Sequence, residues 1–327
     1  MKRILSLLAL LGLCVSLSAC GGEPQLPEAE GVAREETLLT VDGREVTAGQ
    51  YLYWLNAICC ALEEQYQAAG KTLDWSAPVE EGTLGDYVKN QALRSAALYA
   101  TVETWAETYG CVLTEEDRSA MESQWADKAA SLGGEEAYLN LLAQKGLDRA
   151  GAERMAEDHY LYVQLCALAE TANTSLYAAE ADLAAFFAER GCLTVQVLRF
   201  SGEDAQRQAE EVFAQLNRSD DPAAEFDALG ASEPQTIVPG DGTLPEELSA
   251  AAAALAPGQV SGILESGGGY AILLRREDDL SAVRLAHFDH RLQSAADGAD
   301  IQTAESYVAL DVSAFWEEIL QTRAVGD

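Results

Sequence analysis

Apolar residues recur at helical spacing along residues 47–171. The first such segment carries Tyr51, Leu55 and Ile58 on one face, and this interval of three or four residues predicts an amphipathic helix. Further segments with the same spacing follow, most of them closed by glycine. The pattern therefore predicts an almost wholly helical domain, which we place at residues 37–190.

The pattern changes in residues 191–280. Residues 194–200 are rich in β-forming side chains, three short helical segments follow, and two short strands flank a glycine turn. This order predicts a small domain, so that the fold class of the chain is α+β. Residues 281–327 contain one further strand and a last helix, 312–321. One hypothesis for this tail is that it packs on the helical domain, which would make the small domain an insertion.

The first twenty residues have the pattern of an export signal. Lys2 and Arg3 precede an apolar run over residues 4–15, which is shorter than the roughly 20 apolar residues that a membrane-spanning helix needs. Cys20 comes directly after Leu-Ser-Ala, and this tetrapeptide resembles the bacterial lipobox. The resemblance implies a signal peptide at 1–19 and lipid on the Cys20 thiol. The alternative is an ordinary signal peptide with an incidental cysteine.

Residues 20–36 are rich in glycine, proline and glutamate and poor in apolar side chains, which predicts a flexible tether. A lipid on Cys20 would hold such a chain at the extracytoplasmic face of a membrane, because buried acyl chains contribute about 0.8 kcal/mol per CH₂ group. We therefore expect a lipid-anchored, extracytoplasmic lipoprotein whose folded part stands away from the bilayer.

The net charge limits the classes of partner that we expect, and the cysteine content limits the disulfides. The chain has 54 acidic and 21 basic residues, a formal net charge of −33, and such a surface repels nucleic acid. Five cysteines remain after Cys14 and Cys20 are set aside, and an odd number without regular spacing does not predict a disulfide framework. Their thiol state is left open. These cysteines are Cys59, Cys60, Cys111, Cys166 and Cys192.

No pattern in the sequence predicts a metal or a cofactor. His287 and His290, with Asp289 between them, are spaced as His-x-x-His, but we expect the stretch to be irregular or extended and no second ligand group is evident. The run Gly267-Gly268-Gly269 opens a strand and not a helix, so it indicates a hairpin turn and not a phosphate-binding loop.

Short stretches of the helical part resemble the N-terminal domain of extracytoplasmic foldases of the PrsA and SurA type. They are residues 41–47 (Val-Asp-Gly-Arg-Glu-Val-Thr), 134–138 (Gly-Glu-Glu-Ala-Tyr) and 145–147 (Lys-Gly-Leu). The resemblance implies a helical chaperone domain, and unfolded or newly exported polypeptides as partners. Its aromatic side chains have two interpretations, either core residues or the lining of a cleft for unfolded chains; these are Tyr51, Tyr53, Trp54, Trp105 and Trp125.

Residues 192–279 resemble a parvulin, the peptidyl-prolyl isomerase module of those foldases. The resemblance is strongest at 244–248 (Leu-Pro-Glu-Glu-Leu), 255–261 (Leu-Ala-Pro-Gly-Gln-Val-Ser) and 269–273 (Gly-Tyr-Ala-Ile-Leu). It implies an apolar groove for a prolyl peptide and no cofactor. The chain thus resembles a foldase lipoprotein with a degenerate parvulin domain.

The departures from the parvulin pattern concern the groove itself. Two histidine positions of the family correspond to Val197 and Ala271, and two apolar pocket positions correspond to Leu244 and Leu248. No catalytic residue can be assigned. Prolyl isomerisation breaks no covalent bond, so the histidines are not required by the chemistry as such.

We therefore expect a membrane-anchored foldase that binds unfolded exported polypeptides and has weak or no isomerase activity. Two alternatives stay open. One is an active prolyl isomerase with an altered pocket, and the other is a non-catalytic adaptor lipoprotein with one fixed partner.

Overall fold

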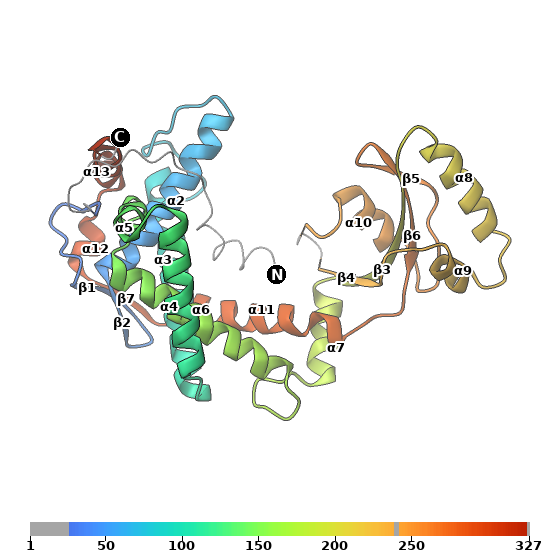
Figure 1. Cartoon of the computed structure of the whole chain (residues 1–327), viewed down its shortest axis with the longest axis horizontal. Coiled ribbons are helices and arrows are strands. Elements are labelled where there is room, and N and C mark those ends of the chain that lie inside the picture. Colours follow the sequence, from blue (N-terminus) through green and yellow to red (C-terminus); the bar gives the residue numbers. More distant parts are fainter. Residues whose placement is uncertain (1–25, 239–241, 326–327) are drawn as a thin grey trace. The chain divides into compact units, whose positions relative to one another are not determined.

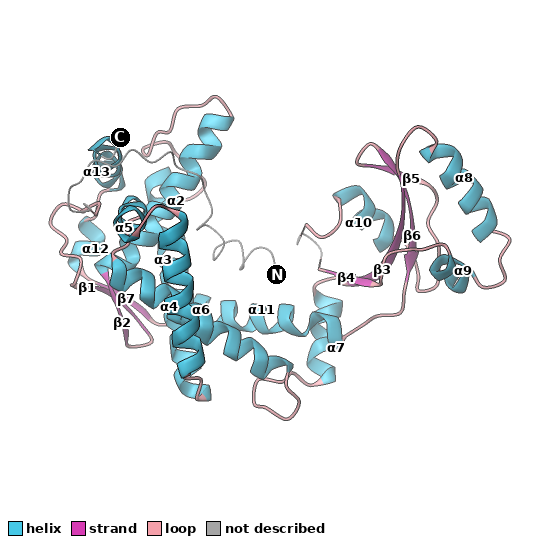
Figure 2. Cartoon of the chain, viewed as in Figure 1, coloured by secondary structure: helices cyan, strands magenta, loops and turns pink. Residues whose placement is uncertain are grey.

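The computed structural model describes residues 26–238 and 242–325, which divide into two compact units. The unit that we call the helical unit comprises residues 26–168 and 290–325, and the other, the α+β unit, comprises the described residues of 169–289. Figure 1 traces the elements along the chain, and Figure 2 distinguishes helices from strands. The predicted fold class, a helical domain followed by a small α+β domain, is confirmed.

The helical unit begins with a small antiparallel sheet. β1 (Thr37–Val41) pairs with β2 (Arg44–Thr47) through a tight turn in which Asp42 and Gly43 both have positive φ. On its other side, β1 pairs with β7 (Ile301–Thr303). The end of the chain therefore contributes a strand to this unit, and the α+β unit lies in sequence between its two stretches.

Helices make up the rest of this unit. Three of the longest helices start at a threonine. The threonine hydroxyl accepts a hydrogen bond from the backbone N–H of the residue three positions later, and the side chain of that later residue accepts one from the threonine N–H. At Thr47 the partner is Gln50, and Thr83 and Thr114 cap in the same way. Each such box satisfies two N–H groups that the helix leaves without a partner. The helices are α2 (Ala48–Ala68), α3 (Leu84–Tyr109), α4 (Glu115–Ser131), α5 (Glu135–Gln144), α6 (Arg149–Glu170), α12 (Glu305–Ala309) and α13 (Val312–Val325).

Aromatic side chains fill the core between α2, α3 and α13. Tyr51 is fully buried, and its hydroxyl donates to the Lys89 carbonyl oxygen at 3.0 Å. Trp75 packs edge-on against Trp316, with ring centroids 5.6 Å apart, so the last helix closes this core. Phe315 of the same helix is also buried.

The described start of the chain is packed and differs in part from the flexible tether that the sequence predicts. Ala29 is buried in the core of the helical unit. Arg34 donates to the carbonyl oxygens of Pro27, at 2.9 Å, and Gly146, at 2.6 Å. These two contacts fix the segment from Leu26, because a half-buried guanidinium requires acceptors once it has left water.

The α+β unit is built on an antiparallel sheet of order β4-β3-β6-β5, with α10 on one face and α8 and α9 on the other (Figure 1). The alternation of side chains explains the two layers: Val197 and Leu273 point to α10, whereas Leu198 and Ile272 point to α8 and α9. The elements are β3 (Leu193–Phe200), α8 (Ala205–Leu216), α9 (Pro222–Ala228), β4 (Gln235–Ile237), α10 (Glu246–Ala253), β5 (Leu264–Ser266) and β6 (Gly269–Arg275).

A third apolar cluster joins elements that the sequence analysis does not foresee. α7 (Glu180–Glu189) buries Phe186 and Phe187 against Val283, which ends the short 3₁₀ turn before α11 (Arg284–Asp297). The expectation of an irregular or extended stretch around His287 and His290 is therefore wrong. Both lie on α11, and the His287 ring packs against Phe186.

Candidate functional site

The four predicted groove residues come together on one face of the α+β unit. Val197 on β3 pairs with Leu273 of β6, and Ala271 is the next residue of β6 on the same face. Leu248 of α10 and Leu244, just before that helix, cover them. Spacing in the sequence thus identifies side chains that the fold places in one cluster.

Burial shows that this cluster is a packed interior. The four side chains are between 0% and 7% exposed, and their apolar neighbours belong to the same core. Because none of the four has a polar side-chain atom, the cluster closes without an unsatisfied hydrogen-bonding group. A prolyl ring could contact Val197 and Ala271 only after Leu244 or Leu248 moved outward.

A polar network holds α9 to the opposite face of the sheet. Gln196 donates to the Asp227 carboxylate at 3.0 Å, and the Arg276 guanidinium contacts the same carboxylate at 2.5 Å. The hydrogen bonds from Gln196 and Arg276 lower the pKa of Asp227 below its ordinary value. All three groups are satisfied within the network, which indicates a structural role.

A second candidate site lies in the helical unit, where a cavity of about 440 Å³ opens among β2, α2, α3 and α6. Its apolar wall is aromatic: Tyr53 and Trp54 are buried, and Trp54 packs against Tyr99 with ring centroids 4.6 Å apart. The Tyr99 hydroxyl is buried and finds no hydrogen-bond partner among the described residues. A cavity of this size is in the usual range for ligand pockets.

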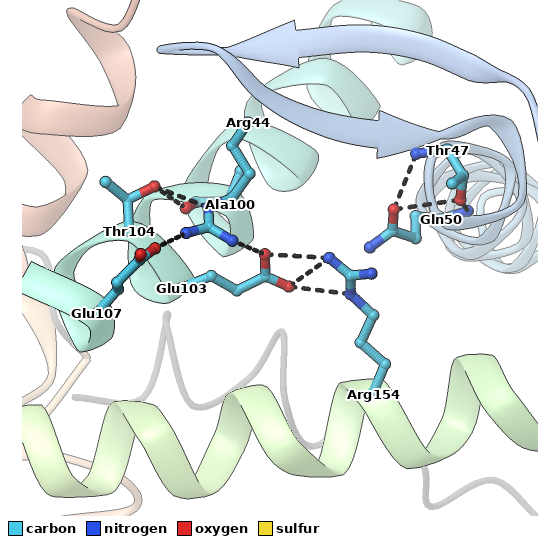
Figure 3. Close-up of polar contacts among 8 residues, drawn as sticks. All are labelled: Arg44, Thr47, Gln50, Ala100, Glu103, Thr104, Glu107 and Arg154. Atoms are coloured by element: carbon cyan, nitrogen blue, oxygen red, sulfur yellow. Dashed lines mark hydrogen bonds and ion pairs between the residues drawn. The ribbon is translucent and has the colours of Figure 1, made fainter. Parts of the chain in front are cut away.

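Charged side chains form the polar wall of this cavity, and Glu103 is one of them. The Glu103 carboxylate lies between two guanidinium groups (Figure 3): Arg154 of α6 contacts it at 2.8 Å, and Arg44 of β2 contacts it at 3.3 Å. Arg44 also contacts Glu107 at 2.6 Å and donates to Thr104 at 3.0 Å. Glu103 therefore links three elements that are far apart in the sequence.

Asp158 is the most unusual acid of this wall. It is 5% exposed, and burial, followed by the nearby Glu103 carboxylate, raises the pKa of Asp158 to about 8. The nearby Glu103 carboxylate disfavours a second negative charge on Asp158. Burial likewise raises the pKa of Tyr99 well above its ordinary range and that of Tyr53 to about 12.

Comparison with known proteins identifies the α+β unit. Residues 175–278 match the family model of the PPIC-type PPIase domain. These residues form a PPIC-type domain. The predicted resemblance of residues 192–279 to a parvulin is thereby confirmed. No curated protein matches the chain.

Solved structures show distant similarities over most of the chain. The foldase protein PrsA from Streptococcus pneumoniae str. Canada MDR_19A is 18% identical, covers 77% of this chain and 93% of its own, and gives a TM-score of 0.30. The Lactococcus lactis foldase protein PrsA is 15% identical over 86% and 99% of the two chains, with a TM-score of 0.31. A SurA-like chaperone of Campylobacter jejuni is 14% identical over 82% and 99%, with a TM-score of 0.21. The assignment of the PPIC-type domain rests on the family match.

The PPIC-type domain has no histidine between residues 192 and 279. At the two positions that the resemblance assigns to histidine, Val197 and Ala271 pack in its core. In the described part of this domain, no group of histidine, cysteine, aspartate or glutamate side chains could hold a metal ion. The arrangement can present an apolar surface, and the Ser232 and Ser261 hydroxyls next to it already accept the backbone N–H groups of Val197 and Leu273.

The aromatic residues divide between the two interpretations left open by the sequence. Tyr51 belongs to the core, Tyr53 and Trp54 are buried and also line the cavity, and Trp105 and Trp125 are half-buried. The acids of the cavity were not found from the sequence, since Glu103 and Asp158 are far apart and no motif joins them. The predicted lipid-bearing Cys20 lies outside the described residues.

Proposed function

We propose that this chain is a membrane-anchored extracytoplasmic foldase that binds unfolded, newly exported polypeptides and has weak or no prolyl-isomerase activity. The observation that supports it most is the PPIC-type domain at residues 175–278. Domains of this type act on peptidyl-prolyl bonds, and the helical unit adds an aromatic-lined cavity of about 440 Å³ as a further surface for polypeptide.

Weak catalysis follows from the state of the predicted groove. Isomerisation about an X-Pro bond has a barrier of roughly 18–20 kcal/mol, and an enzyme lowers it only by binding the twisted bond more tightly than the planar one. Val197 and Ala271 present no donor or acceptor to the twisted bond, and both are buried. An apolar patch opened by movement of Leu244 would bind a peptide in either state about equally, which gives binding without much acceleration.

The anchoring part of the proposal rests on the sequence pattern before Cys20. Among the described residues, no helix has the length and apolar character to cross a bilayer. In this proposal the acyl chains on Cys20 hold the protein at the membrane surface from which exported chains emerge. Radiolabelled fatty acid incorporated into the wild type but not into a Cys20→Ala variant would support it. Equal labelling of both would contradict it.

Suppression of aggregation tests the foldase function. The chain from Gly21, which includes every described residue, is added to several unrelated chemically unfolded proteins as they are diluted into buffer, and light scattering is recorded. A foldase reduces the scattering of all of them at substoichiometric to equimolar amounts. Protection of a single protein would favour an adaptor with one fixed partner, and protection of none would contradict the proposal.

A further inference from the structure

The cavity of the helical unit has a negative excess of charge. Its wall contains four carboxyl groups and two guanidinium groups; these are Glu35, Glu103, Asp148, Asp158, Arg34 and Arg154. Both arginines are engaged, because Arg34 donates to the carbonyl oxygens of Pro27 and Gly146, and Arg154 holds Glu103. An incoming anion would meet mostly carboxylates, whereas a cation would be attracted.

The aromatic wall also favours a cation. Trp54 packs between Tyr53, at a centroid distance of 4.8 Å, and Tyr99, at 4.6 Å. A cation within about 6 Å of an aromatic face is attracted by the quadrupole of the ring, more strongly when water is excluded. The protein uses this contact elsewhere, as the Arg149 guanidinium lies 4.8 Å from the centroid of the Trp125 ring.

Two polar groups in the cavity are suited to an N–H donor. The buried Tyr99 oxygen has no partner among the described residues, and a buried hydroxyl without a partner destabilises the fold unless a ligand supplies one. Asp158, which is 5% exposed, lacks a basic partner at ion-pair distance among the described residues. Burial raises the pKa of this carboxyl, and a neighbouring cation would favour its ionised form.

We propose that this cavity binds a single basic side chain, lysine or arginine, of an extended polypeptide. The cationic group lies between Asp158 and the Tyr99 hydroxyl, and its aliphatic stem packs along Trp54. This inference deepens the proposed foldase function, on which it rests, by naming the residue type that a client presents to the helical unit. It also accounts for a cavity in the helical unit that is lined by both aromatic and acidic side chains.

Titration with a blocked pentapeptide tests it. Acetyl-Gly-Gly-Lys-Gly-Gly-amide is added to the ¹⁵N-labelled chain from Gly21, and the indole N–H signal of Trp54 is followed by NMR. A peptide with acetyl-lysine at the centre has nearly the same shape but no charge. We expect a saturable shift with the lysine peptide and binding at least about tenfold weaker with the acetylated one, since a charge-assisted contact contributes about 1.5–3 kcal/mol. Equal affinities would overturn the proposal.

Variants separate the site from nonspecific attraction by an acidic protein. Asp158→Asn keeps the shape of the side chain, and Tyr99→Phe removes only the hydroxyl; each should weaken the lysine peptide several-fold while the circular dichroism spectrum is unchanged. Glu116→Gln removes an exposed acid of α4, outside the cavity, and should leave affinity unchanged. If Glu116→Gln weakens binding as much as Asp158→Asn, only general electrostatic attraction is present.

The outcome is distinguishable from failure of the foldase function. A chain that binds the lysine peptide at this cavity but suppresses no aggregation would retain the site and contradict the foldase. A chain that suppresses aggregation equally well with Asp158→Asn, and shows no preference for the charged peptide, would retain the foldase and overturn the site.

Discussion

Replacing Asp158 with asparagine removes a carboxyl group that takes up a proton when the helical unit folds. Burial, followed by Glu103, raises the pKa of Asp158 to about 8 in the folded chain, from an ordinary value of 3.8. Between these values the folded chain holds a proton that the unfolded chain has released. The free energy of unfolding therefore falls as the pH rises from about 4 toward about 8, and the contribution is fully present only at the acidic end.

The size of the effect follows from the linkage between protonation and folding. A whole proton of difference corresponds to about 1.4 kcal/mol per pH unit. Asp158 is only 5% exposed, so water screens this term little, although the proton belongs to the pair with Glu103 rather than to one residue. Between about pH 5.5 and about pH 7.5, we expect the wild-type free energy of unfolding to drop by up to about 3 kcal/mol. For Asp158→Asn, we expect the free energy of unfolding to fall by less than about 0.5 kcal/mol over the same pH range.

Urea denaturation, followed by tryptophan fluorescence, measures the free energy of unfolding of the helical unit in the wild type and in Asp158→Asn. Every tryptophan of the chain lies in the helical unit; they are Trp54, Trp75, Trp105, Trp125 and Trp316. Asp148→Asn is the matched control, because Asp148 lines the same cavity but is exposed, and asparagine can replace it as acceptor of the Gly151 N–H. A wild-type stability that does not fall with pH, or a fall that Asp158→Asn retains, would refute the reasoning.

Three further predictions concern packing and are measured by chemical denaturation with hydrogen exchange. Glu103→Gln should destabilise the helical unit by about 1–3 kcal/mol, since it leaves two partly buried arginines without their shared carboxylate. The Glu107 side chain is 80% exposed, so Glu107→Gln should cost less than about 0.5 kcal/mol. Equal losses of stability in the two variants would contradict this prediction. Leu248→Ala should destabilise the PPIC-type domain by about 2–5 kcal/mol by leaving a cavity in its core, and unchanged exchange in β3 and β6 would contradict its burial. Gly269→Ala should cost at least about 1–3 kcal/mol because the added Cβ would lie 2.3 Å from a carbonyl oxygen of β3, whereas Gly262→Ala, with open space around it, is the matched control.

Local signals in the sequence determined most of the helical unit. Thr47, Thr83 and Thr114 each start a helix by hydrogen bonds within four residues, and the glycine at 110 ends one in the left-handed conformation. Such contacts are readable because both partners are close in sequence. The three-residue strand β4 was missed because its only support is pairing with β3, some forty residues earlier.

The missed α11 shows a different failure. Its Phe288 and Leu292 are buried at helical spacing, so the sequence contains the helical signal although it was interpreted as an irregular or extended stretch. For the candidate sites, the two residues that the family pattern assigns to the groove, Val197 and Ala271, lie in one apolar cluster of the fold. The pattern could not show that they are buried, because burial depends on Leu244 and Leu248 from another layer.

The acidic cavity could not be predicted at all from the sequence. Glu103 and Glu107 lie one turn apart on α3, as do Arg154 and Asp158 on α6, and each pair alone resembles an ordinary solvated helix face. Only the packing of α3 on α6 brings the four groups together, and only burial changes their chemistry.

Refolding of a proline-limited client tests the central claim most directly. The slow phase of an unfolded protein that waits for an X-Pro bond takes about 10–100 s at room temperature, and it is recorded with and without the chain from Gly21 while light scattering reports aggregation in the same sample. We expect the scattering to fall while the rate constant of the slow phase changes by less than about twofold, since each 1.4 kcal/mol of barrier lowering would accelerate this phase tenfold. A tenfold or greater acceleration at catalytic amounts of the chain would contradict it, and would show that a groove with Val197 and Ala271 in place of histidine is an efficient isomerase.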